Sequence, residues 1–224
     1  WTDKNRNYED LCEKNCIKKM LAYVSKKRQI DSILDVGCGF GRLFETYVDF
    51  GQTFFLFDYA INLLQEAEKN LKNINKNISF INGDLYHLPF KNDSLDVVLT
   101  VRVLHHVKDL DSFFNQVYRV LNENGSFILE IPNKKHLLRI INFLMFKTKV
   151  NPFNTNPYYL KDLFINYHPK YVKNLLKAQG FEIKKTLNTS FFRSAYLKRT
   201  FSSKFLFNAD LFCQKLFSFL NLTP

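Results

Sequence analysis

The chain has 224 residues, of which 46% are apolar and 16% aromatic, and it carries a net charge of +11 at pH 7. A chain of this length and composition can bury a full hydrophobic core, which excludes an intrinsically disordered protein. It has four cysteines, no basic and apolar leader at residue 1, and no uncharged apolar run near the roughly 18 residues that span a bilayer. We therefore expect a soluble cytoplasmic protein with free thiols.

The positive charge is confined to the second half of the chain. Residues 1–112 carry 15 Lys and Arg against 16 Asp and Glu, a net −1, whereas residues 113–224 carry 17 against 5, a net +12. Such asymmetry is typical of proteins that bind an anionic substrate, a membrane surface or nucleic acid. A lysine-rich face that is merely solvated gives the same count, so charge alone does not identify a partner.

Apolar periodicity predicts strands that alternate with helices along the chain. In chain order the expected elements are a helix at 8–28, a strand at 32–36, a helix at 42–50, a strand at 53–58, a helix at 60–73, strands at 78–82 and 95–101, a helix at 109–121, a turn at 122–125, a strand at 126–131, a helix at 169–180 and a strand at 181–187. Such alternation is typical of a parallel sheet with helices on both faces. The predicted fold class is α/β, a Rossmann-like, doubly wound, mostly parallel sheet.

Two segments fall outside this alternation. Residues 133–168 are too long for an ordinary connection and are rich in aromatics and lysine, so we expect an inserted lid. Residues 188–224 predict only Phe-rich helix. We expect one domain over 1–224, with a cofactor-binding core at 30–132, the lid, the end of the core at 169–187 and a C-terminal helical segment.

The stretch 32-SILDVGCGFGR-42 places Gly37, Gly39 and Gly41 at alternate positions directly after a predicted strand. In an open parallel sheet, ligands bind beyond the carboxyl ends of the strands, and glycine lets the backbone approach a ligand closely. A phosphate-binding P-loop needs Lys and then Ser or Thr after its last glycine, but Arg42 and a leucine follow here. The dinucleotide fingerprint needs its third glycine at position 42, so the spacing also disfavours a nicotinamide cofactor.

Acidic residues lie at or just after the carboxyl ends of three of the predicted strands. Asp35 is the penultimate residue of the first, Asp58 is the last residue of the second, and Asp84 comes just after the third. The carboxylate of Asp58 suits the two hydroxyls of a ribose, through charge-assisted hydrogen bonds worth about 1.5–3 kcal/mol each. Asp84 suits an exocyclic adenine amine, and the amide of Leu85 suits a ring nitrogen. With the glycines, these acids predict a cofactor that has a ribose but no pyrophosphate.

At these residues the sequence resembles the class I S-adenosylmethionine-dependent methyltransferases, and within them the small-molecule group often called methyltransferase type 11. The matching stretches are 33-ILDVGCGFGR-42, 55-FLFDYAINLLQEAEKN-70, 83-GDLYHLPFKNDSLDVVLTVRVLHHV-107, 117-VYRVLNENGSFILEIPN-133 and 170-KYVKNLLKAQGFEI-183. They cover about residues 30–187 in the family's order. The resemblance implies the fold, S-adenosylmethionine as cofactor with S-adenosylhomocysteine as product, and methyl transfer as the reaction.

The resemblance also implies a cofactor-binding set beyond the carboxyl ends of the first four strands. Its members are Asp35, Gly37, Cys38, Gly39, Arg42, Asp58, Tyr59, Asp84, Leu85, Thr100 and Val101. The loop that starts at Asp35 would receive the methionine part. Asp58 would bind the ribose hydroxyls, and the next three members would hold adenine. Thr100 and Val101 would line the methionine and sulfonium side.

Methyl transfer from a sulfonium asks mainly for positioning, because the methyl group is already activated. Where the acceptor is a hydroxyl or ammonium group, a histidine with an unperturbed pKa of about 6.5 can remove its proton. The candidates are His105, His106 and His168, of which His106 and His168 are the two predicted as catalytic residues. The alternative for each is structural, either packing under the cofactor or capping a helix.

Residues 134–149 of the expected lid place Lys and Arg around a set of apolar side chains. This pattern is typical of a helix with a wide apolar side and cationic flanks. The apolar side either packs on the sheet as core, or roofs an apolar acceptor pocket whose mouth attracts a carboxylate or phosphate.

Three further patterns are weaker. Cys12 and Cys16 lie one helical turn apart, but no second Cys or His pair completes a zinc site, so no metal is expected. The string 156-NPYY-159 resembles a nucleobase-amine motif of some methyltransferases, yet it lies far beyond the strand that this motif must end. The family's sheet normally closes with a seventh strand, and 188–224 predict none.

We therefore expect a methyltransferase that acts on an O, N or C atom of a small molecule, apolar or anionic. An RNA methyltransferase is the first alternative, favoured by the charge of the second half but lacking a base-recognition motif, which makes nucleic acid a disfavoured partner. The second alternative is a protein that binds S-adenosylmethionine without turnover.

Overall fold

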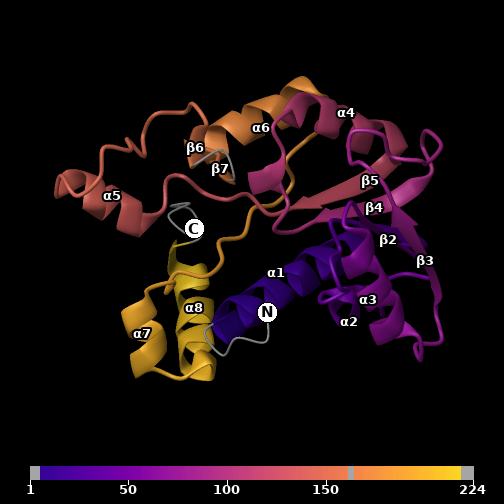
Figure 1. Cartoon of the computed structure of the whole chain (residues 1–224), viewed down its shortest axis with the longest axis horizontal. Helices are drawn as coiled ribbons and strands as arrows, with labels where there is room; N and C mark the ends of the chain where they lie inside the picture. Colours follow the sequence, from indigo (N-terminus) through magenta and orange to yellow (C-terminus); the bar gives the residue numbers. More distant parts are fainter. Residues whose placement is uncertain (1–5, 161–163, 218–224) are drawn as a thin grey trace.

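The computed structural model describes residues 6–160 and 164–217 and centres on a parallel sheet (Figure 1). Its five strands are β1 (Ser32–Val36), β2 (Thr53–Asp58), β3 (Asn77–Asn82), β4 (Leu95–Thr100) and β5 (Leu121–Leu129). They lie in the order β3-β2-β1-β4-β5. Because β1 pairs with both β2 and β4, the strand order reverses there, and a crevice is expected beyond the carboxyl ends of β1 and β4.

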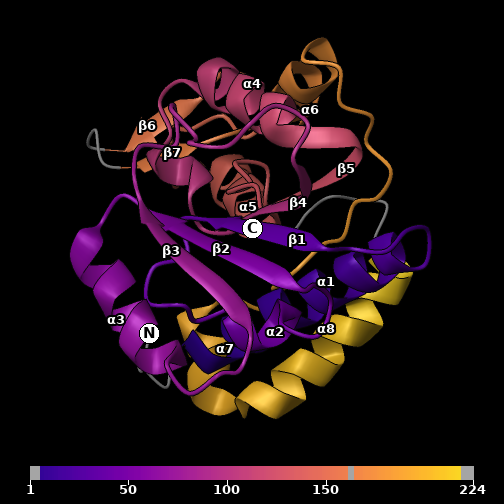
Figure 2. The same ribbon diagram turned by 90° about the vertical axis from the view of Figure 1, so that its right-hand side faces the viewer.

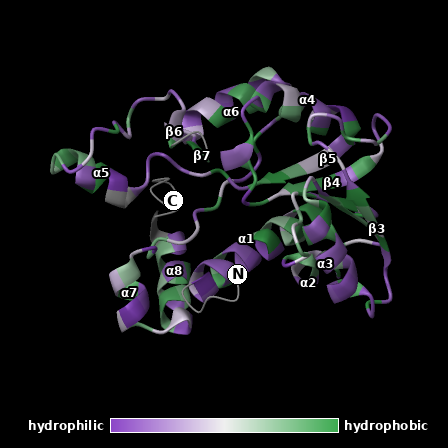
Figure 3. Ribbon diagram, in the orientation of Figure 1, coloured by the Kyte–Doolittle hydropathy of each residue, from purple (hydrophilic) through white to green (hydrophobic). Residues whose placement is uncertain are grey.

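Helices cover both faces of the sheet, so the predicted doubly wound α/β fold is confirmed (Figure 2). One face is covered by α1 (Asn7–Ser25), α2 (Phe44–Tyr47) and α3 (Ile61–Leu71), and the other by α4 (Leu110–Val120) and α6 (Pro169–Ala178). The two central strands β1 and β4 are nearly continuous apolar runs, which is typical of strands buried on both faces (Figure 3).

Alternate side chains of β1 and β4 enter two separate cores. Ile33 and Val97 pack with side chains of α1, α2 and α3, whereas Leu34 and Val98 pack with those of α4 and α6. The register pairs Ile33 with Val97 and Leu34 with Val98, so each core receives side chains at the same level of the sheet. This layering holds the carboxyl ends of the strands along one edge.

Most helix boundaries in the structure agree with the predicted ones to within a few residues. Asp109 caps α4, because its side chain accepts a hydrogen bond from the Ser112 amide at 3.0 Å. Pro169 opens α6, and Gly180 follows its end with φ +93°, as the proline and glycine pattern predicts.

Three predicted elements differ in the structure. The strand predicted at 181–187 is wrong: the segment has no regular secondary structure, although Phe181 and Ile183 are half-buried, and a cavity of about 1270 Å³ lies between it and β5. The turn predicted at 122–125 lies inside β5, where these four residues lie opposite the single residue Asp96 of β4. The helix predicted at 42–50 shortens to α2, flanked by turns.

The expected lid at 133–168 is anchored at its two ends. It contains α5 (Leu137–Leu144) and a small antiparallel pair, β6 (Tyr158–Leu160) and β7 (Phe164–Asn166), while residues 161–163 lie outside the described residues. Tyr167 is buried and its hydroxyl donates to the carbonyl oxygen of Val107. Figure 1 shows the chain leaving β5 and running outward to α5, which lies away from the sheet. Packing of α5 on the sheet, one of the two alternatives for this helix, is therefore wrong.

The C-terminal segment is helical, as predicted, over α7 (Ala195–Thr200) and α8 (Ser203–Phe217), and residues 218–224 lie outside the described residues. α8 packs along α1: the Tyr8 hydroxyl donates to Asp210 Oδ1 at 2.7 Å. Within the described ranges, every helix is too short or too polar to traverse a bilayer.

Candidate functional site

The loop after β1 turns through three left-handed glycines. Gly37, Gly39 and Gly41 have φ values of +80°, +54° and +80°. The amides of Gly37 and Cys38 both donate to the carbonyl oxygen of Phe57, at 2.7 and 3.2 Å, which fixes the loop against the end of β2. Left-handed backbone favours glycine over other residues, so the alternate spacing has a local cause.

The three glycines have different surroundings. A Cβ at Gly37 would lie 2.2 Å from Val103 Cγ2, and one at Gly41 would lie 3.1 Å from Leu71 Cδ1. A Cβ at Gly39 would meet no atom within 4 Å. Packing within the protein therefore accounts for the small residue at Gly37 and Gly41, whereas Gly39 borders open space that a ligand can use.

Asp58 closes this space from the side of β2. Its Oδ2 accepts a hydrogen bond from the Gly39 amide at 2.7 Å, and its Oδ1 accepts one from the Ala60 amide at 2.8 Å. Each carboxylate oxygen has a second lone pair, so the half-buried group can still accept two hydroxyl groups. The residues present thus fit the expected ribose, and Asp58 also orders the loop that borders it.

Asp35 lies beneath the loop rather than at its surface. It is buried at the end of β1, and the Tyr47 hydroxyl donates to its Oδ2 at 2.8 Å. Burial raises the pKa of Asp35 to about 7, against the opposing effects of the Tyr47 hydrogen bond and the Arg42 charge. Cys38 is buried beside it, and burial likewise raises the pKa of its thiol. Both side chains support the loop from below.

The residues predicted to hold adenine lie together after β2 and β3. Asp84 is exposed; its Oδ1 accepts from the Tyr86 amide at 3.0 Å, and its Oδ2 lies 3.9 Å from His87 Nδ1. Leu85 is half-buried, and Tyr59 is 82% exposed, so its ring stands free in solvent. Asn82 donates to the carbonyl oxygens of Asp58 and Tyr59, both at 2.9 Å, and so ties the two strand ends together.

The carboxyl end of β4 carries a buried hydroxyl group. Thr100 is fully buried, and its Oγ1 has no hydrogen-bond partner among the described residues. An unpaired buried polar group costs about 1–3 kcal/mol, so this hydroxyl is a natural contact for a ligand or water. Val101, the next residue, is also buried. Both lie at the strand end, as the sequence predicts.

Comparison with known proteins identifies the part of the chain that carries this site. Residues 34–129, which include the loop, Asp58, Asp84 and the end of β4, match the family described as a methyltransferase domain. Residues 34–129 are a methyltransferase domain. The predicted resemblance is therefore confirmed, and with it S-adenosylmethionine as the methyl donor of this domain.

Relatives of the methyltransferase domain extend the comparison. An uncharacterized protein of Methanocaldococcus jannaschii is 33% identical over 135 residues, which cover 60% of this chain and 56% of that protein. A probable S-adenosylmethionine-dependent methyltransferase of Mycolicibacterium smegmatis is 27% identical over 156 residues, 69% of this chain and 53% of that protein. The chain thus spans about half the length of these curated relatives. A solved S-adenosylmethionine-dependent methyltransferase from Aquifex aeolicus shares the fold, with a TM-score of 0.59, 14% identity, and coverage of 84% of this chain and 88% of that chain.

Arg42 of the methyltransferase domain turns away from the glycine loop. Its guanidinium group forms ion pairs with Asp10 and, at 2.9 Å, with Glu13 Oε2, both on α1. The sequence predicted that Arg42 binds the cofactor, but the ion pairs described for it are with residues of α1. It attaches α1 to the loop that leaves β1.

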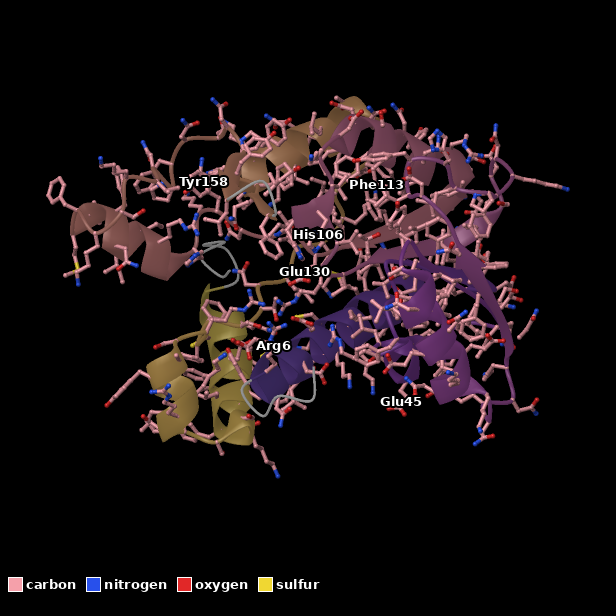
Figure 4. All side chains as sticks on the ribbon, in the orientation of Figure 1. Arg6, Glu45, His106, Phe113, Glu130 and Tyr158 are labelled. Atoms are coloured by element: carbon pink, nitrogen blue, oxygen red, sulfur yellow. The ribbon has the colours of Figure 1, made fainter. Side chains whose placement is uncertain are left out.

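A buried ion network that the sequence did not predict lies at the same edge of the domain. Glu13 accepts from Arg102 Nε at 2.8 Å and lies 3.7 Å from the guanidinium group of Arg193. Glu130, directly after β5, accepts from the Arg102 amide at 2.9 Å (Figure 4). Burial and the neighbouring Glu13 raise the pKa of the Glu130 carboxyl. A sequence signal existed for Glu130, since it is an acid at the carboxyl end of a strand, as Asp58 is.

The three histidines occupy different environments. His105 and His106 lie on the 3-10 helix η2 (Leu104–His106), with ring centroids 4.1 Å apart, and both rings contact Phe164. Burial, His106 and Arg102 lower the pKa of His105 to about 4, whereas His106 is exposed (Figure 4). His168 is buried, and its Nδ1 accepts from the Lys170 amide at 3.1 Å, which caps α6. The structure therefore gives His168 a capping contact and leaves His106 accessible.

Proposed function

We propose that this chain transfers the methyl group of S-adenosylmethionine to a small-molecule acceptor. The observation that carries the proposal is the open position at Gly39, whose amide is bound to Asp58 at the edge where the strand order reverses. A left-handed glycine with space around it lets a ligand approach the backbone, and the adjacent carboxylate suits ribose hydroxyls. The match of residues 34–129 to a methyltransferase domain supports the same conclusion.

Each end of the proposed site suits one part of the cofactor. Asp58 would accept from the ribose hydroxyls, while Asp84 Oδ2 would accept from the adenine amine. The exposed ring of Tyr59 and the half-buried Leu85 would flank the adenine ring. Gly37, Gly39 and the end of β4 at Thr100 would border the methionine part.

The chemistry then depends mainly on position. When bound, the cofactor supplies a methyl group that its sulfonium charge has already activated. The chain has to hold the acceptor atom in line, about 3–3.5 Å from that carbon, and such positioning contributes roughly 7–11 kcal/mol. His106, exposed at this edge of the sheet, is the histidine placed to remove a proton where the acceptor carries one.

Named relatives support a small-molecule acceptor. A sterol 24-C-methyltransferase of Schizosaccharomyces pombe is 28% identical over 111 residues, a norajmaline N-methyltransferase of Rauvolfia serpentina 31% over 113, and a ubiquinone biosynthesis O-methyltransferase of Bartonella bacilliformis 28% over 102. Their names cover transfer to C, N and O atoms. We propose a small molecule with an O, N or C acceptor atom for this chain as well.

A screen with methyl-labelled S-adenosylmethionine tests the proposal. Sterols, amines, phenols and quinols would be offered separately, with RNA in a parallel reaction, and label in the product would be measured by mass spectrometry. We expect label in one small-molecule class and none in RNA. An Asp58→Ala variant provides the blank, because its cofactor affinity should be reduced. Label in RNA alone would contradict the small-molecule acceptor, and binding without any turnover would favour a non-catalytic role.

A further inference from the structure

The outer part of the inserted segment exposes an apolar surface, which we call the α5 surface. It consists of five large side chains that are between 40% and 96% exposed: Ile141, Leu144, Met145, Phe146 and Phe153. Figure 1 places α5 at the end of the molecule farthest from β3, and Figure 3 shows hydrophobic colour at its outward end. Large apolar side chains that cluster on the surface in this way mark a site of contact with a membrane or another protein.

The geometry of α5 places three of these side chains on one face of the helix. Ile141, Leu144 and Met145 stand at i, i+3 and i+4, so they share one face of the helix. The Phe146 amide donates to the Phe143 carbonyl at 3.0 Å, and the Lys147 amide donates to the Asn142 carbonyl at 2.8 Å, which is the Schellman closure of a helix end.

Phe146 stands where this closure normally has glycine. Its φ is +56°, a conformation that disfavours a bulky residue, and its ring is 96% exposed. Neither folding nor solubility accounts for a phenylalanine at this position. A contact outside the chain would account for it.

Charge accompanies the apolar side chains. Residues 131–160 contain no Asp or Glu, and they carry five Lys and Arg residues. Lys134 is directed inward, to the carbonyl oxygens of Asn154 and Asn156 at 3.0 and 2.7 Å. Lys147 and Lys149 are exposed directly after α5. The α5 surface is therefore flanked by cations with no acid within the segment.

We infer that the α5 surface binds an anionic lipid bilayer, with its apolar side chains at the acyl boundary and Lys147 and Lys149 at the headgroups. Apolar side chains flanked by lysines suit such an interface, in which each lysine near the surface adds to the attraction. A nucleic-acid surface would pair cations with stacking rings. Phe146 and Phe153 could stack in this way, but the other three members of the α5 surface are aliphatic or thioether side chains, which suit acyl chains. This inference does not depend on methyl transfer.

Charge reversal tests the electrostatic half of the inference. Sedimentation with vesicles of phosphatidylcholine mixed with phosphatidylglycerol is expected to show binding of the wild type, and vesicles of phosphatidylcholine alone little. The variant Lys147→Glu/Lys149→Glu should bind the anionic vesicles at least about 30-fold more weakly. Its matched control is Lys72→Glu/Lys76→Glu beyond α3, which also changes the net charge by −4, from +11 to +7, and should bind like the wild type.

Phe146→Gly tests the apolar half without a loss of stability. Glycine relieves the left-handed conformation, so the melting temperature should stay the same or rise. Binding to anionic vesicles should nevertheless fall about tenfold or more, because a large apolar side chain no longer enters the bilayer. Ile61→Ser, which removes an exposed side chain at the start of α3, serves as the control and should not change vesicle binding.

Three outcomes would overturn the inference. One is a wild type that does not sediment with anionic vesicles. Another is an equal loss of binding in the α3 controls and in the α5 variants, which would make the interaction a matter of net charge. The third is binding to single-stranded RNA, without vesicle binding, that survives Phe146→Gly and is lost on Lys147→Glu/Lys149→Glu.

Discussion

Replacing Asp58 with alanine is expected to weaken the binding of S-adenosylmethionine by about 2–4 kcal/mol, roughly 30- to 1000-fold. Asp58 is proposed to accept two charge-assisted hydrogen bonds from the ribose. It also accepts from the Gly39 amide at 2.7 Å, so its loss frees the loop that borders the cofactor. Isothermal titration calorimetry of the variant measures the change, and circular dichroism checks that the fold is kept.

The matched control is Asp49→Ala, which removes an exposed aspartate that lies between α2 and β2. This variant should bind the cofactor like the wild type. If Asp58→Ala changed the affinity by no more than Asp49→Ala does, the ribose site would have to lie elsewhere.

Gly37→Ala is expected to lower the free energy of unfolding by about 2–5 kcal/mol, because two penalties add. The backbone at Gly37 has φ +80°, and the new Cβ would lie 2.2 Å from Val103 Cγ2. For a chain of this size the melting temperature should fall by roughly 4–20 °C. In a double-mutant cycle with Val103→Ala, which removes the overlapping methyl group, part of the loss should be recovered.

Gly39→Ala is the comparison that separates packing from binding. Its φ is +54°, but a Cβ there would meet no atom within 4 Å, so only backbone strain of about 1–2 kcal/mol is expected. The variant should stay folded and yet lose affinity for S-adenosylmethionine, since the methyl group occupies space proposed for the cofactor. Equal stability losses in Gly37→Ala and Gly39→Ala would contradict this division of roles.

The sequence predicted the parts of the fold that local chemistry determines. Apolar runs located β1 and β4, and a capping aspartate and a proline–glycine pair bounded α4 and α6. The glycine spacing and the acids at the strand ends located the loop, and Asp58 lies against it as expected. Each of these signals lies within a few neighbouring residues, so it can be recognised in a single sequence.

Contacts between distant residues could not be predicted in this way. Glu13 and Arg193 meet across the chain through the packing of α1, which no local pattern encodes. The segment at 181–187 has the alternation of a strand, but a strand also needs a partner edge, and a cavity separates it from β5. Likewise, the apolar face of α5 was visible in the sequence, while its exposure depends on where the inserted segment turns.

The most direct test of the central claim is calorimetric titration of the wild-type chain with S-adenosylmethionine and, separately, with NAD. The proposed site has a ribose carboxylate and an open glycine at position 39, but it lacks the glycine spacing that a pyrophosphate requires. We predict saturable binding of S-adenosylmethionine at one site and no binding of NAD. Tight binding of NAD with no heat from S-adenosylmethionine would contradict the account of this loop.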